Sequence, residues 1–139
     1  MNRADLQALA DIRINEAVAL LSLPVPMPDG AYYLAGYAVE CALKACIAKE
    51  FGQHEWPDKQ LVNRCYTHDI SDLIVIAALE IERKADVASN PARDRNWRLV
   101  KDWSEQDRYK RRSEGDARTL IAAITDTTNG VLPWIKARW

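Results

Sequence analysis

The sequence predicts an all-α protein, an up-and-down bundle of four to five helices that forms a single domain over residues 1–139. Three observations predict this fold class. Apolar residues recur at helical spacing, no stretch alternates apolar and polar residues as a strand would, and capping residues, prolines and glycines separate the apolar stretches. Hydrophobic residues make up 48% of the chain and charged residues 28%, so the composition is that of a globular protein with a core.

The first helix is expected from about Arg3 to Ser22, with an apolar face formed by Leu6, Ala10, Ile14, Ala17 and Leu21. Three prolines then occur at alternate positions in LPVPMPDG, residues 23–30. Because proline lacks a backbone N–H and fixes φ, this stretch ends the helix and forms a stiff, extended connection. Asp29 is a suitable N-cap for the second helix, which is expected to run to about Phe51 with Gly52 as its C-cap.

An irregular connection, residues 53–67, is expected before the third helix, which begins near His68 or Asp69. The inward-facing residues of the third helix are Ile70, Leu73, Ile74, Ala77 and Ile81. The dipeptide Asn90-Pro91 combines an N-cap residue with a proline at the first helical position, and so predicts the start of a fourth helix. That helix is expected to hold Trp97, Val100 and Trp103.

The polar stretch SEQDRYKRRSEG, residues 104–115, is expected to be a loop. Asp116 is expected to cap the last helix. The apolar face of that helix consists of Ala117, Leu120, Ile121, Ile124, Val131, Leu132 and Ile135. Gly130 and Pro133 lie in the same stretch and should bend or fray its final turns.

Charge and cysteine content narrow the functional classes. The formal net charge of −1 creates no overall field for nucleic acid, so such a contact would have to come from a local patch. The three cysteines, Cys41, Cys46 and Cys65, include no C-x-x-C pair and are expected to be reduced, in a cytoplasmic protein. Residues 1–13 contain early acids and no apolar core, unlike a signal peptide. The apolar run 30–48 contains two charges, which predict a buried helix and no contact with a membrane.

Motifs for metals, cofactors and nucleophilic catalysis are missing from the sequence. No group of cysteine, histidine and carboxylate residues has the spacing of a metal site, and the isolated glycines form no phosphate-binding loop. The sequence also shows no pair of nucleophile and base. It therefore predicts no metal and no cofactor.

The second expected helix carries one polar stripe on an otherwise apolar surface. Its members are two phenols, a carboxylate and an amine, which fall within about 60° of arc: Tyr33, Tyr37, Glu40 and Lys44. A Glu–Lys pair at i, i+4 contributes only about 0.2–0.5 kcal/mol on an exposed helix, and its burial would cost more unless other groups satisfy the charges. Further partners are therefore expected, and the candidates are His68, Arg108, Tyr109 or a second subunit. Two hypotheses remain: a structural network inside the bundle or a dimer, or the lining of a ligand-binding cleft.

The segment YYLAGYAVECALKA, residues 32–45, resembles the second helix of the HEPN family, small helical domains of higher eukaryotes and prokaryotes named for nucleotide binding. Family members show an aromatic residue, a small residue and then A-[VI]-E-x-x-L-K-A, which here runs from Ala38 to Ala45. THDISDL, residues 67–73, resembles the H-D-L-x-x-L opening of the family's third helix, and Arg108-Tyr109 resembles the Arg-Tyr pair before its last helix. The three motifs occur in the family's order over about residues 5–136.

The resemblance implies a bundle of four to five helices that forms a homodimer. Many family members are metal-independent ribonucleases, often toxins paired with a small nucleotidyltransferase antitoxin, and others are non-catalytic modules that bind RNA or nucleotides. RNA or a nucleotide is therefore the implied ligand, and a nucleotidyltransferase-like protein is the implied partner. In the ribonucleases an R-x4–6-H motif supplies a histidine as general base on the 2′-OH and an arginine that stabilises the phosphorane charge.

This chain lacks the ribonuclease motif of the family. No histidine follows Arg108, and neither His54 nor His68 has an arginine at the required spacing. Arg64 precedes His68 with a spacer of three, one residue too short. The sequence therefore predicts a non-catalytic module that binds RNA, a nucleotide or a protein partner. The alternative is a ribonuclease toxin with a displaced site built from His68, Arg64 or Arg108.

The segment DRYKRRSEG, residues 107–115, is the candidate for RNA contact. Four basic residues surround its tyrosine, and phosphates could take the charges while an unstacked base lies on the ring: Arg108, Lys110, Arg111 and Arg112 around Tyr109. Neighbouring acids dilute the positive field, so the affinity should be modest and salt-sensitive. A further hypothesis joins this segment to the polar stripe as one nucleotide site formed by Tyr33, Tyr37, Glu40, Lys44, Asp69, Arg108 and Tyr109.

Overall fold

The computed structural model of the chain describes residues 1–51 and 58–139. These residues form eight α-helices and one 3₁₀-helix and no strand, which confirms the all-α class predicted from the sequence. The helices outnumber the predicted four to five because two predicted helices are each broken in two and a further short helix lies in a predicted connection. The predictions made for Gly52 and His54 fall outside the described residues.

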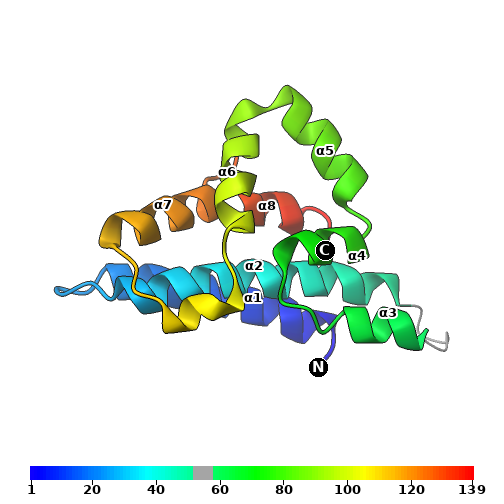
Figure 1. The fold of residues 1–139 in the computed structure, drawn as a ribbon, viewed down its shortest axis with the longest axis horizontal. Coiled ribbons are helices and arrows are strands. Elements are labelled where there is room, and N and C mark those ends of the chain that lie inside the picture. The colour runs from blue at the N-terminus through cyan, green and yellow to red at the C-terminus, as the bar shows by residue number, and fades with distance from the viewer. Residues whose placement is uncertain (52–57) are drawn as a thin grey trace.

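Helices α1 (Arg3–Leu21) and α2 (Pro28–Glu50) form a long hairpin, as predicted (Figure 1). Asn2 caps α1 and exchanges hydrogen bonds with Asp5 in a capping box. Along α2 the fully buried residues are mostly small: Ala31, Ala35, Ala38, Ala42 and Ala45. Short side chains let the helices around α2 approach it closely, and this makes α2 the central helix of the bundle.

The start of α2 differs from the prediction, because Asp29 is not its N-cap. Met27 occupies that position without a side-chain hydrogen bond, and Pro28 is the first helical residue, where a missing N–H costs nothing. The Asp29 carboxylate instead accepts a hydrogen bond of 2.6 Å from the backbone N–H of Arg112. Asp29 therefore holds the segment around residue 112 against the first turn of α2.

A short helix, α3 (Lys59–Arg64), occupies part of the connection that was predicted to be irregular. The Asp58 carboxylate caps it by accepting from the backbone N–H of Gln60. Helix α4 (Ile70–Ile76) follows at the predicted place, and Asp69 is its N-cap. The histidine-aspartate motif therefore lies at a helix start, as the sequence suggested.

The predicted third helix stops after α4 and resumes as α5 (Glu80–Ser89). The break lies at Ala78, whose φ of 57° is in the left-handed region. The prediction that Ile81 faces inward is therefore wrong: the chain changes direction at Ala78, and Ile81 is 86% exposed.

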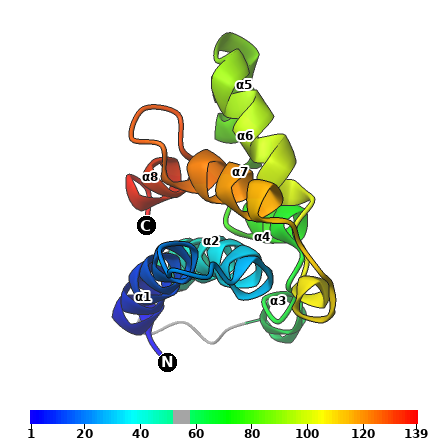
Figure 2. The same cartoon turned by 90° about the vertical axis from the view of Figure 1, so that its left-hand side faces the viewer.

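Helix α6 (Pro91–Lys101) begins where predicted, because the Asn90 side chain accepts a hydrogen bond from the backbone N–H of Arg93. Helices α5 and α6 together form an arm that stands out from the rest of the molecule (Figures 1 and 2). After α6 the predicted loop contains a 3₁₀-helix, η1 (Glu105–Tyr109), which packs against α2.

The last predicted helix is also two helices, α7 (Glu114–Thr125) and α8 (Val131–Lys136). Ser113 is the N-cap of α7, and Asp116 occupies the third helical position and completes a capping box, so the prediction of Asp116 as N-cap is wrong by one turn. Gly130 is the N-cap of α8, and a Cβ there would lie 2.2 Å from the carbonyl oxygen of Asp126. This close approach explains why glycine occupies this position. The helix breaks before Gly130 and continues through Pro133.

The inward face predicted for these last two helices is confirmed, since all seven of its residues are buried: Ala117, Leu120, Ile121, Ile124, Val131, Leu132 and Ile135. Figure 2 shows α1 and α2 on one side of the core and α4, α7 and α8 on the other. Trp103 fills the space above Gly36, where a Cβ would lie 2.2 Å from its indole ring. Across the described residues no helix is both long and apolar enough to cross a membrane.

Candidate functional site

The polar stripe predicted on α2 is continuous in the structure. The rings of Tyr33 and Tyr37 stack with centroids 6.2 Å apart, and Trp103 lies 6.0 Å from Tyr33. One turn further on, Lys44 donates a hydrogen bond of 2.9 Å to Glu40 Oε1. The stripe therefore has an aromatic half and a charged half.

The charged half of the stripe contacts a histidine from outside α2. His68 Nδ1 lies 2.9 Å from Glu40 Oε1, and His68 Nε2 lies 3.3 Å from Glu105 Oε2. Glu40 is only 2% exposed, so its charge requires such partners. The sequence argument that the Glu–Lys pair needs a further polar group is confirmed, and of its three candidate residues His68 is the one in contact.

The other two candidates point elsewhere. The Arg108 guanidinium lies over the ring of its own neighbour Tyr109, 4.8 Å from the centroid. Tyr109 is 75% exposed. Neither therefore completes the Glu40 network, and neither lines the cavity that Tyr37, Glu40 and Lys44 border.

His68 is held between two acids, and this limits its chemistry. An ionised carboxylate only accepts hydrogen bonds, so Nδ1 donates to Glu40 when it carries the proton, whereas Nε2 only lies near the Glu105 carboxylate. Nδ1 is then not free to remove a proton from a substrate hydroxyl. The other oxygen of Glu40, Oε2, is buried and has no hydrogen-bond partner within residues 1–51 and 58–139.

Arg64 and Asp69 have neighbours other than the Glu40 network. Arg64 borders a hollow together with Thr67 and Asp72, whereas His68 borders a separate cavity of about 480 Å³ with Glu40 and Lys44. The Asp69 carboxylate is occupied as the N-cap of α4, where it accepts from the backbone N–H of Asp72 at 2.9 Å. Arg64 thus borders a different hollow from His68, and Arg108 borders neither of the two.

The cysteines are free in the structure, and Cys41 and Cys46 are buried as predicted. Burial raises the pKa of each of these two thiols to about 11. They are thus protonated at neutral pH, and a protonated thiol is a poor nucleophile.

The basic segment divides into an internal part and an exposed part. The Arg112 guanidinium lies 4.1 Å from the centre of the Tyr32 ring and donates a hydrogen bond to the carboxylate of Asp107. Side-chain exposure is 25% for Arg112, 50% for Lys110 and 98% for Arg111. Arg112 was predicted to contact RNA together with its neighbours, but its charge is used inside the fold.

Asp107 is the buried anion that holds Arg112. The Asp107 side chain is fully buried, and its carboxylate also accepts from the backbone N–H of Ser104 at 2.8 Å. Burial alone would raise the pKa of Asp107, but the hydrogen bonds from Arg112 and Ser104 outweigh it, so the pKa lies below its ordinary value. The same contact with Asp107 raises the pKa of Arg112.

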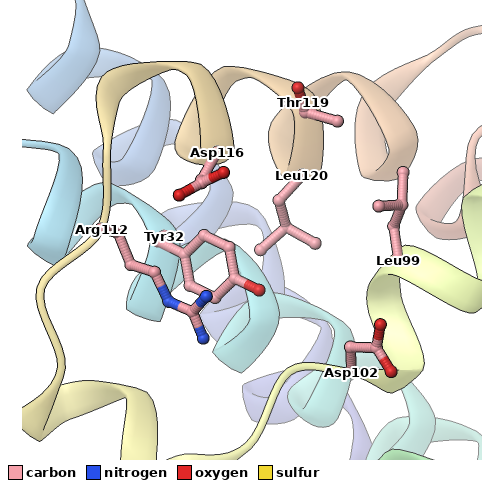
Figure 3. Close-up of a pocket in the computed structure, with 7 residues that line it drawn as sticks. All are labelled: Tyr32, Leu99, Asp102, Arg112, Asp116, Thr119 and Leu120. Atoms are coloured by element: carbon pink, nitrogen blue, oxygen red, sulfur yellow. The ribbon is translucent and has the colours of Figure 1, made fainter.

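Beside Arg112 lies a pocket of about 250 Å³ that the sequence did not predict (Figure 3). It is lined by residues of α2, α6 and α7 and of the segments that adjoin them: Tyr32, Leu99, Asp102, Arg112, Asp116, Thr119 and Leu120. Tyr32 is 7% exposed, and burial raises the pKa of its phenol against the opposing charge of Arg112. Because these residues come from distant parts of the chain, no spacing in the sequence could have indicated the pocket.

Comparison of the sequence and structure with protein-family models, curated proteins and solved structures gives no match. Within the described residues, no three histidine, cysteine or carboxylate side chains are grouped so that they could hold a metal ion. The resemblance to the HEPN family therefore remains a prediction from the three motifs.

Proposed function

We propose that this chain is a non-catalytic HEPN-type module that binds single-stranded RNA through the exposed part of its basic segment, residues 108–111. The observation that supports this proposal is the division of that segment. Arg112 is anchored on Asp107 and Tyr32, and the four residues before it face the solvent. The anchor presents the exposed residues from a fixed backbone, which lowers the entropy lost on binding.

The exposed residues have the chemistry that single-stranded RNA requires. Arg108, Lys110 and Arg111 supply three positive charges for phosphates, and the 75% exposed ring of Tyr109 offers a face for an unstacked base. Three phosphate contacts on a single strand predict a slope of about −2 for log K against log salt concentration. The expected affinity is modest, with a Kd of about 10 μM at physiological salt.

The contacts of His68 support a non-catalytic module over a ribonuclease. Its two nitrogens face Glu40 and Glu105, and neither of the candidate arginines, Arg64 and Arg108, lies in the same cavity. The alternative remains the displaced-site ribonuclease toxin. Cleavage of RNA by the purified protein without metal, lost in a His68→Ala variant, would favour that alternative.

The proposal is tested by RNA binding of a variant in which Arg108, Lys110 and Arg111 are all replaced by alanine. Fluorescence anisotropy with a labelled ten-nucleotide RNA should show binding weakened about tenfold or more and a flatter salt dependence. The matched control removes three exposed cations elsewhere, Arg3, Lys84 and Arg98. Equal weakening in both triple variants, or no binding by the original protein at 100 times the expected Kd, would contradict the proposal.

The HEPN resemblance extends the proposal to protein partners. We propose that the module forms a homodimer and that its partner is a nucleotidyltransferase-like protein, as in toxin–antitoxin pairs. Exposed apolar residues in the turn between α1 and α2 support the homodimer: Leu23, Val25 and Met27. The nucleotidyltransferase partner is tested by co-purification with the product of a neighbouring nucleotidyltransferase gene.

A further inference from the structure

The hydroxyl of Tyr32 opens into the pocket of Figure 3, although most of this side chain is buried. Tyr32 is 93% buried, and within the described chain no hydrogen bond is found for its hydroxyl. Figure 3 shows this hydroxyl directed toward the side of the pocket that Leu99 and Asp102 form. Because this hydroxyl faces the pocket and has no partner among the described residues, it can bond a polar ligand atom there.

The pocket adjoins the proposed RNA-binding surface. Arg112 lines the pocket, and Arg111, the next residue along the chain, has a 98% exposed side chain. Asp29 accepts from the backbone N–H of Arg112 and lies one turn before Tyr32 on α2. When the phosphates of an RNA strand lie on residues 108–111, a neighbouring nucleotide of that strand can therefore reach the pocket.

The lining suits one flat, partly polar ring. Leu120 is buried, whereas Leu99 is 38% exposed and offers apolar surface that a ring could cover. A volume of about 250 Å³ lies below the range of drug-sized ligand pockets. Such a pocket could take a single base but not a whole dinucleotide.

The polar lining contains both donors and acceptors, and the Nε of Arg112 has no partner among the described residues. Arg112 is paired with Asp107, and the Asp116 carboxylate accepts from the backbone N–H of Ser113. The exposed Asp102 carboxylate, at the end of α6, has no such bond among the described residues and keeps both oxygens available. Two adjacent acceptor oxygens match two adjacent donors. Among the RNA bases only guanine has two donors side by side on its Watson–Crick edge, at N1 and N2.

We propose that this pocket binds one guanine base of the RNA, with the Asp102 carboxylate accepting from guanine N1–H and N2–H and the Tyr32 hydroxyl bonded to the same base. The proposal rests on the proposed RNA-binding function. It adds a base preference to a surface that otherwise recognises only phosphates and stacked rings.

The test compares ten-nucleotide RNAs that are all uridine except for one central guanosine or inosine. Inosine lacks the N2 amino group and loses one of the two hydrogen bonds, so the original protein should bind the guanosine RNA about tenfold more tightly. An Asp102→Asn variant cannot accept two donors with one oxygen, and its ratio of the two Kd values should fall to about one. Tyr32→Phe keeps the ring beneath Arg112 but removes a hydrogen bond that both RNAs share, so it should weaken both and leave the ratio unchanged.

The controls separate this inference from the proposed function. Asp94→Asn removes an acid at the other end of α6, on the Arg98 side chain, and should leave the ratio unchanged. The triple alanine variant of residues 108, 110 and 111 should weaken both RNAs equally and also keep the ratio. Equal affinity of the original protein for the two RNAs would overturn the guanine pocket while RNA binding stands. No binding of either RNA would overturn the RNA-binding function and the guanine pocket with it.

Discussion

Among single residues, Asp107 has the largest expected influence on the site, because it is buried and holds Arg112. Asp107→Asn removes the negative charge and should destabilise the fold by about 2 kcal/mol at pH 7, since the Arg112 guanidinium would lose its anion. The pKa of Asp107 is lowered in the folded protein. Its stabilisation is therefore present above the unfolded pKa of about 3.9 and is lost as the pH falls below that value.

Urea unfolding at pH 7, 5 and 3.5 measures this difference between the original protein and Asp107→Asn. The gap in unfolding free energy should be constant between pH 7 and pH 5 and should shrink at pH 3.5. Asp94→Asn, which affects an ion pair at the surface, should cost less than about 0.5 kcal/mol at every pH. A gap that grows toward acid pH would contradict the assigned role of Asp107.

The residues of the site differ in how far the sequence could predict them. Glu40 and Lys44 lie one turn apart on one helix, so their contact follows from helical geometry alone. His68 could be predicted as a candidate partner of this pair because a buried ion pair is stable only when further polar groups contact it. The contact of Arg112 with Tyr32 joins residues 80 positions apart, as 112 − 32 = 80. It depends on how η1 and α7 pack on α2, and neither periodicity nor spacing contains that information.

Among the helices, the break between α4 and α5 offers a direct test, because Ala78 adopts a φ of 57°. A residue with a Cβ is strained in the left-handed region, whereas glycine adopts it freely. Ala78→Gly should therefore raise the unfolding free energy by about 0.5 kcal/mol, after allowance for the greater freedom of glycine in the unfolded chain.

Ala85→Gly is the matched control, since Ala85 is exposed inside α5, and it should lower the free energy of unfolding by about 1 kcal/mol. Thermal or urea unfolding of both variants checks the opposite signs. A destabilised Ala78→Gly would mean that the left-handed turn is not maintained in solution.

The same break shows where helix prediction from sequence succeeds and where it fails. Asn90 before Pro91 is a strong local signal, and α6 starts there. The sequence around Ala78 contains no comparable signal, because alanine favours helix and no glycine or proline lies beside it to predict a turn. The chain leaves the helix at Ala78 because packing requires α5 to join α6 in the arm, and this tertiary demand overrides local propensity.

For the whole molecule, the proposed homodimer gives the most specific prediction, because it requires a surface that a second copy of the chain covers. The turn between α1 and α2 extends beyond the rest of the molecule at one end of the bundle (Figure 1). Leu23, Val25 and Met27 in this turn are 41%, 77% and 56% exposed. The three prolines make the turn stiff, so little chain entropy is lost when another molecule packs on it. Beside the turn a hollow of about 420 Å³ is lined by the apolar residues Leu20, Leu23 and Leu34 and by the charged residues Arg13 and Glu16.

A double variant, Val25→Asp with Met27→Asp, should therefore convert the dimer to a monomer. In a two-fold symmetric interface each change occurs twice, so four carboxylates would enter the contact and weaken association by about 100-fold or more. Light scattering coupled to size-exclusion chromatography gives the molar mass, and circular dichroism verifies that the variant is folded. Val75→Asp is the control, because Val75 is 52% exposed on α4, away from the turn, and the dimer should persist. A monomeric original protein at 100 μM would contradict the homodimer, and dissociation by Val75→Asp alone would move the interface to the α4 surface.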